Sequence, residues 1–416
     1  MFKGVKEIHQ RDLIGQQAVD YDERVDIRRL RRERIARIQA ELAKRDLGGV
    51  LLYDPINVRY ATGTRFVQIF SMHTAHRYCV VPREGDVVLF TDLNQGDQHL
   101  KDLEGIKLRP AQSCNYFVSG TFNEEVAQRW GMELKVALEE MGIVNEPLGV
   151  DRLEALTAHA LLEQDIKFVD GQSVLEHAHA VKTKDEIALM RQTCAIADVA
   201  CCAVREALRP GVTENELYAI LASTNLRFGG EHQDSKFLAA GGNTNPWYRE
   251  ASDRIVRTGD LVGFDTDMAG PMGYFVCMSR TYLCGDRPNS EQKEAYKLAY
   301  DIIYESIPLF RPGMTLQEIA EKSPPWPEEY KANRYAVLGH GLGMRDEWPA
   351  IYFTDRSWSG MGNYEGQLEE DMVMCVEAYA GREGAREGVK LGEAVLITAN
   401  GPEVITQAPF DWRLLE

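Results

Sequence analysis

The chain has 416 residues, a formal net charge of −17, 44% hydrophobic residues and 27% charged residues. This length is long for one hydrophobic core and predicts two domains. The negative charge argues against nucleic acid or an anionic membrane as a partner, because nothing would neutralise the phosphates. We expect no signal peptide and no apolar run of the ~20 residues that a membrane span needs. The eight cysteines show no metal-binding spacing, so we expect free thiols and a cytoplasmic location.

Residues 1–180 alternate between predicted helices and strands, which is typical of an α/β domain. The predicted elements are a helix over 26–44, a strand over 48–53, a turn over 54–57, strands over 79–82 and 87–91, a helix over 130–141 and a strand over 148–151. No glycine-rich phosphate-binding loop accompanies these elements, so a nucleotide-binding domain is not expected.

A second domain is expected over residues 181–416. Thr183 and Glu186 have the spacing of a capping box at the start of a long amphipathic helix. The phrase Pro210-Gly211-Val212-Thr213 then ends this helix and begins the next, and Pro312-Gly313-Met314-Thr315 repeats the pattern. Two such helix pairs, each beside predicted strands, indicate a duplicated α+β unit.

Two aspartates stand in an apolar stretch of this second domain. Residues 261–267 are predicted to form a buried strand, and residues 274–283 a returning strand after a glycine-rich turn. Asp265 and Asp267 are two positions apart, so on a strand they would point to the same side. Buried carboxylates persist only where a metal ion, a cationic group or a shared proton offsets their desolvation.

Two further polar residues lie in apolar or glycine-rich surroundings. His340 stands between glycines, and Glu377 ends an apolar strand that is followed by a final strand over 389–397. Taken alone, His340 would be read as a core histidine and Glu377 as a surface acid. Together with the two aspartates, they follow the order of a metal site made from oxygen and nitrogen ligands.

The second half of the chain resembles the pita-bread fold of the creatinase and methionine/proline aminopeptidase (M24) superfamily. From about residue 30 onward, the chain is similar to bacterial dimethylsulfoniopropionate lyases of the DddP type. The phrases that carry this resemblance are residues 53–62, 244–247, 264–267, 279–281, 340–343 and 346–349. The resemblance implies an α/β domain over 1–180 and an α+β pita-bread domain over 181–416, with a mixed or antiparallel sheet covered by helices.

The resemblance also assigns roles to individual residues. It places metal ligands at Asp265, Asp267, His340 and Glu377. It makes Asp346 the catalytic base, and it implies substrate contacts at Tyr335 and His73. From the chemistry of a small zwitterion we also expect His340 to handle protons, Trp247, Tyr248 and Trp348 to offer aromatic faces to a cation, and Arg345 to hold a carboxylate. His73 belongs to the first-domain segment 62–78, which is expected to help close a pocket at the two-fold interface of a homodimer.

Two positions depart from the family pattern. Where the lyases carry a bridging aspartate and a bridging glutamate, this chain has Cys277 and Gly392. Glu393 is one residue further on and is expected to face the other side of its strand. A dinuclear centre is therefore not expected. The site would hold no cofactor, or a single weakly bound iron, zinc or manganese ion with Cys277 as a soft extra ligand.

These residues leave three functions open. The first is a lyase that removes a proton next to a carboxylate and releases dimethyl sulfide and acrylate, with Arg345, Arg280 or His340 holding the substrate carboxylate. The second is a metal-free hydrolase of a C–N bond in a small zwitterion, as in creatinase or ectoine hydrolase. In a minor variant of it Cys277 is the nucleophile, although an inert core cysteine is the favoured interpretation. The third is a non-catalytic relative. Peptidase activity is not expected.

Overall fold

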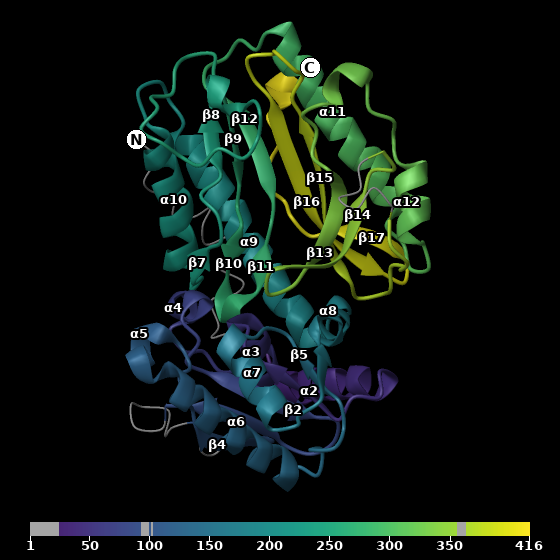
Figure 1. Cartoon of the computed structure of the whole chain (residues 1–416). Coiled ribbons are helices and arrows are strands. Elements are labelled where there is room, and N and C mark those ends of the chain that lie inside the picture. The colour runs from purple at the N-terminus through teal and green to yellow at the C-terminus, as the bar shows by residue number, and fades with distance from the viewer. Residues whose placement is uncertain (1–24, 93–99, 101–102, 356–362) are drawn as a thin grey trace. The chain divides into compact units, whose positions relative to one another are not determined.

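The computed structural model describes residues 25–92, 100, 103–355 and 363–416. The first 24 residues of the predicted N-terminal domain lie outside this description. The described residues form two compact units, Asp26–His179 and Ala180–Glu416, and each is described here by itself (Figure 1).

Within residues 26–179, a mixed sheet with the strand order β4-β3-β2-β1-β5-β6 forms the centre of the N-terminal unit. β1 pairs in parallel with β5 and antiparallel with β2. The strands are β1 (Gly49–Leu52), β2 (Tyr78–Pro82), β3 (Val87–Thr91), β4 (Ile106–Pro110), β5 (Leu148–Val150) and β6 (Phe168–Asp170). The helices are α2 (Ile27–Lys44), α3 (Pro55–Thr62), α4 (Gln68–His73), α5 (Tyr116–Ser119), α6 (Asn123–Glu140), α7 (Ala155–Glu163) and α8 (Gln172–Ala180). This arrangement confirms the predicted α/β class.

Two sequence-based boundaries in this unit were wrong. The predicted turn over 54–57 is the start of α3, because the Asp54 side chain caps the helix by accepting the backbone N–H of Ile56 at 2.8 Å. Pro55 then takes the first helical position, where a missing N–H costs nothing. The helix predicted over 130–141 begins earlier, at Asn123.

The second unit contains two principal sheets among its described residues. One has the order β12-β9-β8 and the other β14-β13-β15-β16-β17, and β12 packs beside β16. The strands are β8 (Leu238–Ala240), β9 (Leu261–Asp265), β12 (Ser279–Leu283), β13 (Val337–Leu342), β14 (Asp346–Tyr352), β15 (Val373–Ala380), β16 (Val389–Thr398) and β17 (Gly401–Val404). Figure 1 shows helices on the outer side of both sheets, as the pita-bread prediction required.

The covering helices come in two similar pairs. They are α9 (Lys184–Ala207) with α10 (Glu214–Arg227), and α11 (Ser290–Ser306) with α12 (Leu316–Lys322). Thr183, Thr213 and Thr315 each cap a helix and form a capping box with a glutamate three residues on. The predicted capping box and the repeated Pro-Gly phrase are therefore confirmed as the starts of these helices.

Helix α9 alone among the described helices is long and apolar enough to cross a membrane by length and composition. The expectation that no such apolar segment exists was too strong. Much of this helix is buried within its unit, where it packs against α10 and β11 (Phe275–Val276). These contacts are typical of a helix in a hydrophobic core.

The predicted acidic hairpin has a different form in the structure. β9 ends at Asp265 and pairs directly with β12, so that Asp265 lies opposite Ser279. The residues between them include β10 (Met268–Ala269) and β11, which form a separate small sheet with β7 (His232–Gln233). Asp267 therefore follows the strand, with a left-handed φ of 37°, a conformation that aspartate tolerates better than most residues.

A fully buried ion pair joins the two sheets on the side away from the aspartates. Arg280 Nη2 donates to Glu393 Oε2 at 2.9 Å, and its Nη1 donates to the backbone oxygen of Gly392 at 2.7 Å. Tyr304 and Thr406 also donate their hydroxyls to Glu393. The pair is thus satisfied on both partners, which is what makes a buried ion pair tolerable.

We expect Glu393→Gln to lower the free energy of unfolding by about 3 kcal/mol, because it leaves the buried Arg280 guanidinium uncompensated. Glu403→Gln breaks the solvent-exposed pair with Arg191 and serves as the control, with an expected loss below about 1 kcal/mol. Urea unfolding of both variants measures the difference. Equal losses would contradict a structural role for the buried pair.

Candidate functional site

Acidic groups from two strands and the turn after one of them meet on the inner side of the second unit. Asp265 ends β9, Asp267 follows it, and Glu377 lies in β15. The ligand atoms of Asp265, Asp267 and Cys277 lie within 4.8 Å of one another, as do those of Cys277, His340, Cys375 and Glu377. All of these side chains are buried. The four predicted metal ligands therefore lie in two adjoining clusters that share Cys277.

Hydrogen-bond donors of the protein already serve the two aspartates. Asp265 Oδ1 accepts the hydroxyl of Ser279 at 2.9 Å and the thiol of Cys277 at 3.3 Å. Asp267 Oδ2 accepts the hydroxyl of Ser235. Burial and the neighbouring Asp265 carboxylate hold the pKa of Asp267 well above its usual range. Asp267 therefore tends to keep a proton.

A buried lysine, which the sequence reasoning did not single out, supplies positive charge to this cluster. The Lys390 side chain is 1% exposed, and its Nζ contacts Glu377 Oε2 and lies 3.9 Å from Asp265 Oδ2. The ammonium also lies 4.4 Å from the centre of the Tyr335 ring, within cation–π range. Burial opposes the charge on Lys390, but Glu377 and Asp265 outweigh it and raise the pKa of the ammonium.

His340 connects two carboxylates. Its Nδ1 lies 3.4 Å from Asp346 Oδ1, and its Nε2 lies 3.7 Å from Glu377 Oε1. Burial lowers the pKa of the imidazole, but Asp346 and Glu377 on either side outweigh this and place it well above the usual value. Glu377 Oε1 is buried without a hydrogen-bond partner. The imidazole Nε2, 3.7 Å away, faces this oxygen.

Asp346 has the accessible carboxylate of the site. Its side chain is 63% exposed, whereas the Glu377 side chain is 1% exposed. Partial desolvation raises the pKa of Asp346, the imidazole of His340 opposes this, and Glu377 and Asp265 add to the rise. The pKa of Asp346 is therefore raised both by partial burial and by the neighbouring carboxylates.

The loop that carries Asp346 is fixed by a second buried ion pair. Lys182 Nζ donates to Glu347 Oε2 at 2.7 Å, and Met344 N donates to Glu347 Oε1 at 2.8 Å. Gly343 leaves room for this carboxylate, since a Cβ there would lie 2.1 Å from its oxygens. The sequence gave no sign of this pair, because its partners are 165 residues apart.

Two of the four predicted aromatic contacts, Tyr335 and Tyr248, lie near the lysine. Tyr248 and Tyr335 have ring centres 5.7 Å apart, and Tyr248 is largely exposed. Trp247 is buried behind them and lies 5.9 Å from the Tyr379 ring. Trp348 instead packs against the hydrophobic core that contains Leu316. The tyrosine pair is thus the aromatic surface that the structure places beside the charged cluster.

The predicted cationic residues have different surroundings. Arg280 is fully buried in its pair with Glu393, so it does not serve as a holder of substrate carboxylate. Arg345 is partly buried and directly precedes Asp346. Glu393 faces away from the cluster, because Gly392 is the residue paired with Glu377. The expectation that Glu393 lies on the wrong face for a metal ligand is confirmed.

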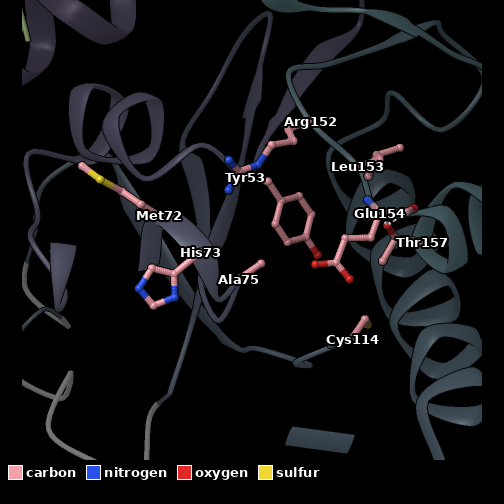
Figure 2. A pocket seen from close by; sticks show the side chains of 9 residues that line it. All are labelled: Tyr53, Met72, His73, Ala75, Cys114, Arg152, Leu153, Glu154 and Thr157. Carbon is pink, nitrogen blue, oxygen red and sulfur yellow. Dashed lines mark hydrogen bonds between the residues drawn. The ribbon is translucent and has the colours of Figure 1, made fainter. Parts of the chain in front are cut away.

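His73 belongs to the N-terminal unit. It lines a cavity of about 250 Å³ together with Tyr53, Met72, Ala75, Cys114, Arg152, Leu153, Glu154 and Thr157. Figure 2 shows His73 and Met72 on one side of this cavity and Arg152, Glu154 and Thr157 on the other. The role of His73 as a substrate contact remains a prediction.

The residues present do not fit two metal ions. Gly392 provides no ligand, the donors on Asp265 Oδ1 are a hydroxyl and a thiol, and the lysine ammonium contacts Glu377. A single ion could use either Asp265, Asp267 and Cys277, or Cys277, His340, Cys375 and Glu377. Both sets include a thiol, so both are softer than the oxygen-rich ligand sets that suit manganese or magnesium.

Comparison with known proteins identifies the family. Residues 188–399 match the model of metallopeptidase family M24, and residues 34–181 match that of the creatinase/prolidase N-terminal domain. This chain belongs to the M24 family. It is 33% identical over 396 residues to dimethylsulfoniopropionate lyase DddP of Roseovarius nubinhibens, covering 94% of this chain and 88% of the relative.

Peptidases of the same family are also similar to this chain. A Xaa-Pro dipeptidase of Pyrococcus furiosus is 30% identical over 250 residues, covering 59% of this chain and 67% of the relative. A solved Xaa-Pro dipeptidase from Bacillus anthracis superposes with a TM-score of 0.74 at 23% identity, covering 92% of this chain and 99% of that one. The structural match confirms the fold, and the lyase match covers more of the chain than the dipeptidase sequence match does.

The Cys277 thiol is expected to be unreactive. The Cys375 thiol, burial and the Asp265 carboxylate together hold the pKa of Cys277 well above its usual range, so little thiolate forms at pH 8. Iodoacetamide should therefore label the partly exposed Cys202 before Cys277 in the folded protein, as mass spectrometry of the peptides will show. Rapid stoichiometric labelling of Cys277 would instead support the nucleophile interpretation.

Proposed function

We propose that this protein is a small-molecule enzyme that acts on a zwitterion, with a β-elimination like that of dimethylsulfoniopropionate lyase as the preferred reaction. The observation that carries the proposal is the accessible Asp346 carboxylate, 3.4 Å from a buried histidine and beside an excess of acidic groups. The 33% identity to DddP over nearly the whole chain supports the same reaction class.

In this reaction Asp346 removes a proton from the carbon next to the substrate carboxylate. The electrons of that C–H bond form the new double bond, and the C–S bond breaks with its electron pair going to sulfur. Dimethyl sulfide and acrylate result, and the proton resides on Asp346. A raised pKa suits this role, because a base works best when its pKa is near the working pH. The exposed Asp346 carboxyl can then pass this proton to water.

The charge balance of the site favours a cationic substrate group. Four carboxyl groups (Asp265, Asp267, Asp346 and Glu377) face one lysine and one histidine. A sulfonium or ammonium group would offset the remaining negative charge, and the Tyr248 and Tyr335 rings offer faces for it. The substrate carboxylate would lie toward His340 and Arg345. His340 is 3.4 Å from Asp346, and Arg345 directly precedes Asp346 in the sequence.

Hydrolysis of a C–N bond in a small zwitterion, without a metal, is the alternative. The buried Lys390 ammonium favours it, since the site contains a permanent cation of its own. The two reactions are told apart by their products. Purified protein incubated with dimethylsulfoniopropionate should release dimethyl sulfide, which gas chromatography detects. Release of ammonia, urea or an amine from creatine- or ectoine-like compounds, without dimethyl sulfide, would favour the hydrolase.

Cleavage of Xaa-Pro dipeptides is the third assay. We expect none, because the two bridging carboxylates of the metal pair are replaced. Dipeptide turnover without any action on small zwitterions would overturn the proposal.

The acidic chain, its free cysteines and the burial of α9 support a cytoplasmic, water-soluble enzyme without nucleic-acid or membrane partners.

Asp346→Asn should lower turnover by about 10²–10⁴-fold while leaving the melting temperature nearly unchanged, because it keeps the shape and removes the base. The matched control is Asp301→Asn, which removes a carboxylate from the exposed pair with Lys297. Steady-state kinetics on the active substrate compare the two variants with the parent. A change of less than about tenfold in Asp346→Asn would remove this residue from the mechanism.

We also propose a homodimer in which segment 62–78 lies at the interface. Val67 and Phe70 expose apolar surface and line a cavity together with Val118, next to the exposed Phe117. Exposed apolar groups gathered in this way are typical of an interaction surface. Light scattering should give twice the chain mass, and Phe117→Asp should shift it toward the monomer. Leu162→Asp, at an exposed leucine of α7, should not. A fully active monomeric parent would contradict the proposal.

A further inference from the structure

The Lys390 ammonium lies beside two buried carboxylates of the site. It contacts Glu377 Oε2 and lies 3.9 Å from Asp265 Oδ2, so it lies between two carboxylates that the family resemblance assigns to metal. The lysine side chain is 1% exposed. A charge so deeply buried is stable only with partners of opposite sign, and here the partners are these two carboxylates.

The backbone around Lys390 is held as firmly as its side chain. The Thr281 hydroxyl donates to the backbone oxygen of Lys390 at 2.8 Å and accepts its N–H at 3.1 Å. This clamp joins β12 to β16 at the lysine. Because alternate residues of a strand share a face, Lys390 and Gly392 point to the same side as Glu377.

The missing side chain at Gly392 completes the arrangement. A Cβ at this position would lie 3.1 Å from the Ser279 hydroxyl, which is a tight approach, and 3.4 Å from the Glu377 Cβ. Ser279 in turn donates to Asp265 at 2.9 Å. The Ser279 hydroxyl and the Lys390 ammonium therefore give Asp265 and Glu377 the partners that a metal ion would otherwise provide.

From these contacts we infer that the Lys390 ammonium is the resident cation of the site and replaces the divalent metal between Asp265 and Glu377. The protein then works as a metal-independent member of a metallopeptidase family. This inference goes beyond the proposed reaction, since it applies equally to elimination and to C–N hydrolysis. It concerns only the cation that holds the carboxylates together.

Metal content of the parent protein is the first test. Protein produced in medium supplemented with manganese, iron and zinc should contain less than about 0.1 equivalent of each per chain by elemental analysis. Its melting temperature should move by less than about 1 °C in 1 mM Mn²⁺ or Zn²⁺, because an ion that does not bind the folded state cannot stabilise it. One or more tightly held metal ions per chain would overturn the inference, whatever the variants do.

Replacement of the lysine is the second test. Lys390→Met keeps the length of the side chain and removes its charge, so Asp265 and Glu377 become available to a metal ion. The melting temperature of this variant should fall without metal and rise by about 5 °C in 1 mM Mn²⁺ or Zn²⁺. Lys297→Met removes a lysine from an exposed pair and is the control, with no gain from metal. A folded Lys390→Met variant that gains nothing from either ion would overturn the inference, and a variant that does not fold leaves the decision to the parent measurement.

Discussion

The contact between the Lys390 ammonium and the Glu377 carboxylate holds the inner face of the second unit together. Without it, Asp265 and Glu377 would be buried acids with no opposite charge between them, and their desolvation would favour opening of the sheet pair. The Thr281 clamp keeps the lysine backbone in register with β12. The position of the carboxylates therefore depends on one side chain that comes from the neighbouring strand.

Strand β16 serves the two faces of the structure differently. Lys390 and Gly392 point to the carboxylate cluster, whereas Glu393 points the other way into its pair with Arg280. Arg280 also holds the backbone oxygen of Gly392. The structural ion pair thus fixes the residue whose missing side chain leaves room at the site. Separately, Lys182 and Glu347 fix the loop in front of Asp346, so two buried pairs support one accessible carboxylate.

Many helix starts and strand faces of the second unit could be predicted from local sequence. The threonine caps and the repeated Pro-Gly phrase marked helix starts, and alternation on a strand placed Glu393 on the far face. Asp54-Pro55 was predicted to form a turn. The same pair of residues is common both in turns and at helix starts, and only the contact between the Asp54 side chain and Ile56 N shows that a helix begins here. Asp265 and Asp267 were grouped correctly, although Asp267 reaches the cluster through a left-handed turn instead of a strand.

Long-range pairing was the part that sequence could not supply. Lys390 was passed over as part of an apolar strand, yet the alternation that placed Glu393 also puts Lys390 on the side of Gly392. This alternation shows that Lys390 faces Glu377 only when the strand register, which pairs Glu377 with Gly392, is known. The Lys182–Glu347 pair left no signal, because nothing local relates residues so far apart. Trp348 was predicted to contact the substrate but packs against the core. The residues of that core come from distant parts of the chain, so the local sequence does not show this direction.

The central claim is that a lysine takes the place of a metal ion in this site. A crystal structure of the parent protein, grown with excess Mn²⁺ and measured at a wavelength where manganese scatters anomalously, tests it most directly. We predict no anomalous peak beside Glu377, and Lys390 Nζ within hydrogen-bond distance of that carboxylate. An anomalous peak shared by Asp265 and Glu377, with the lysine turned away, would contradict the account.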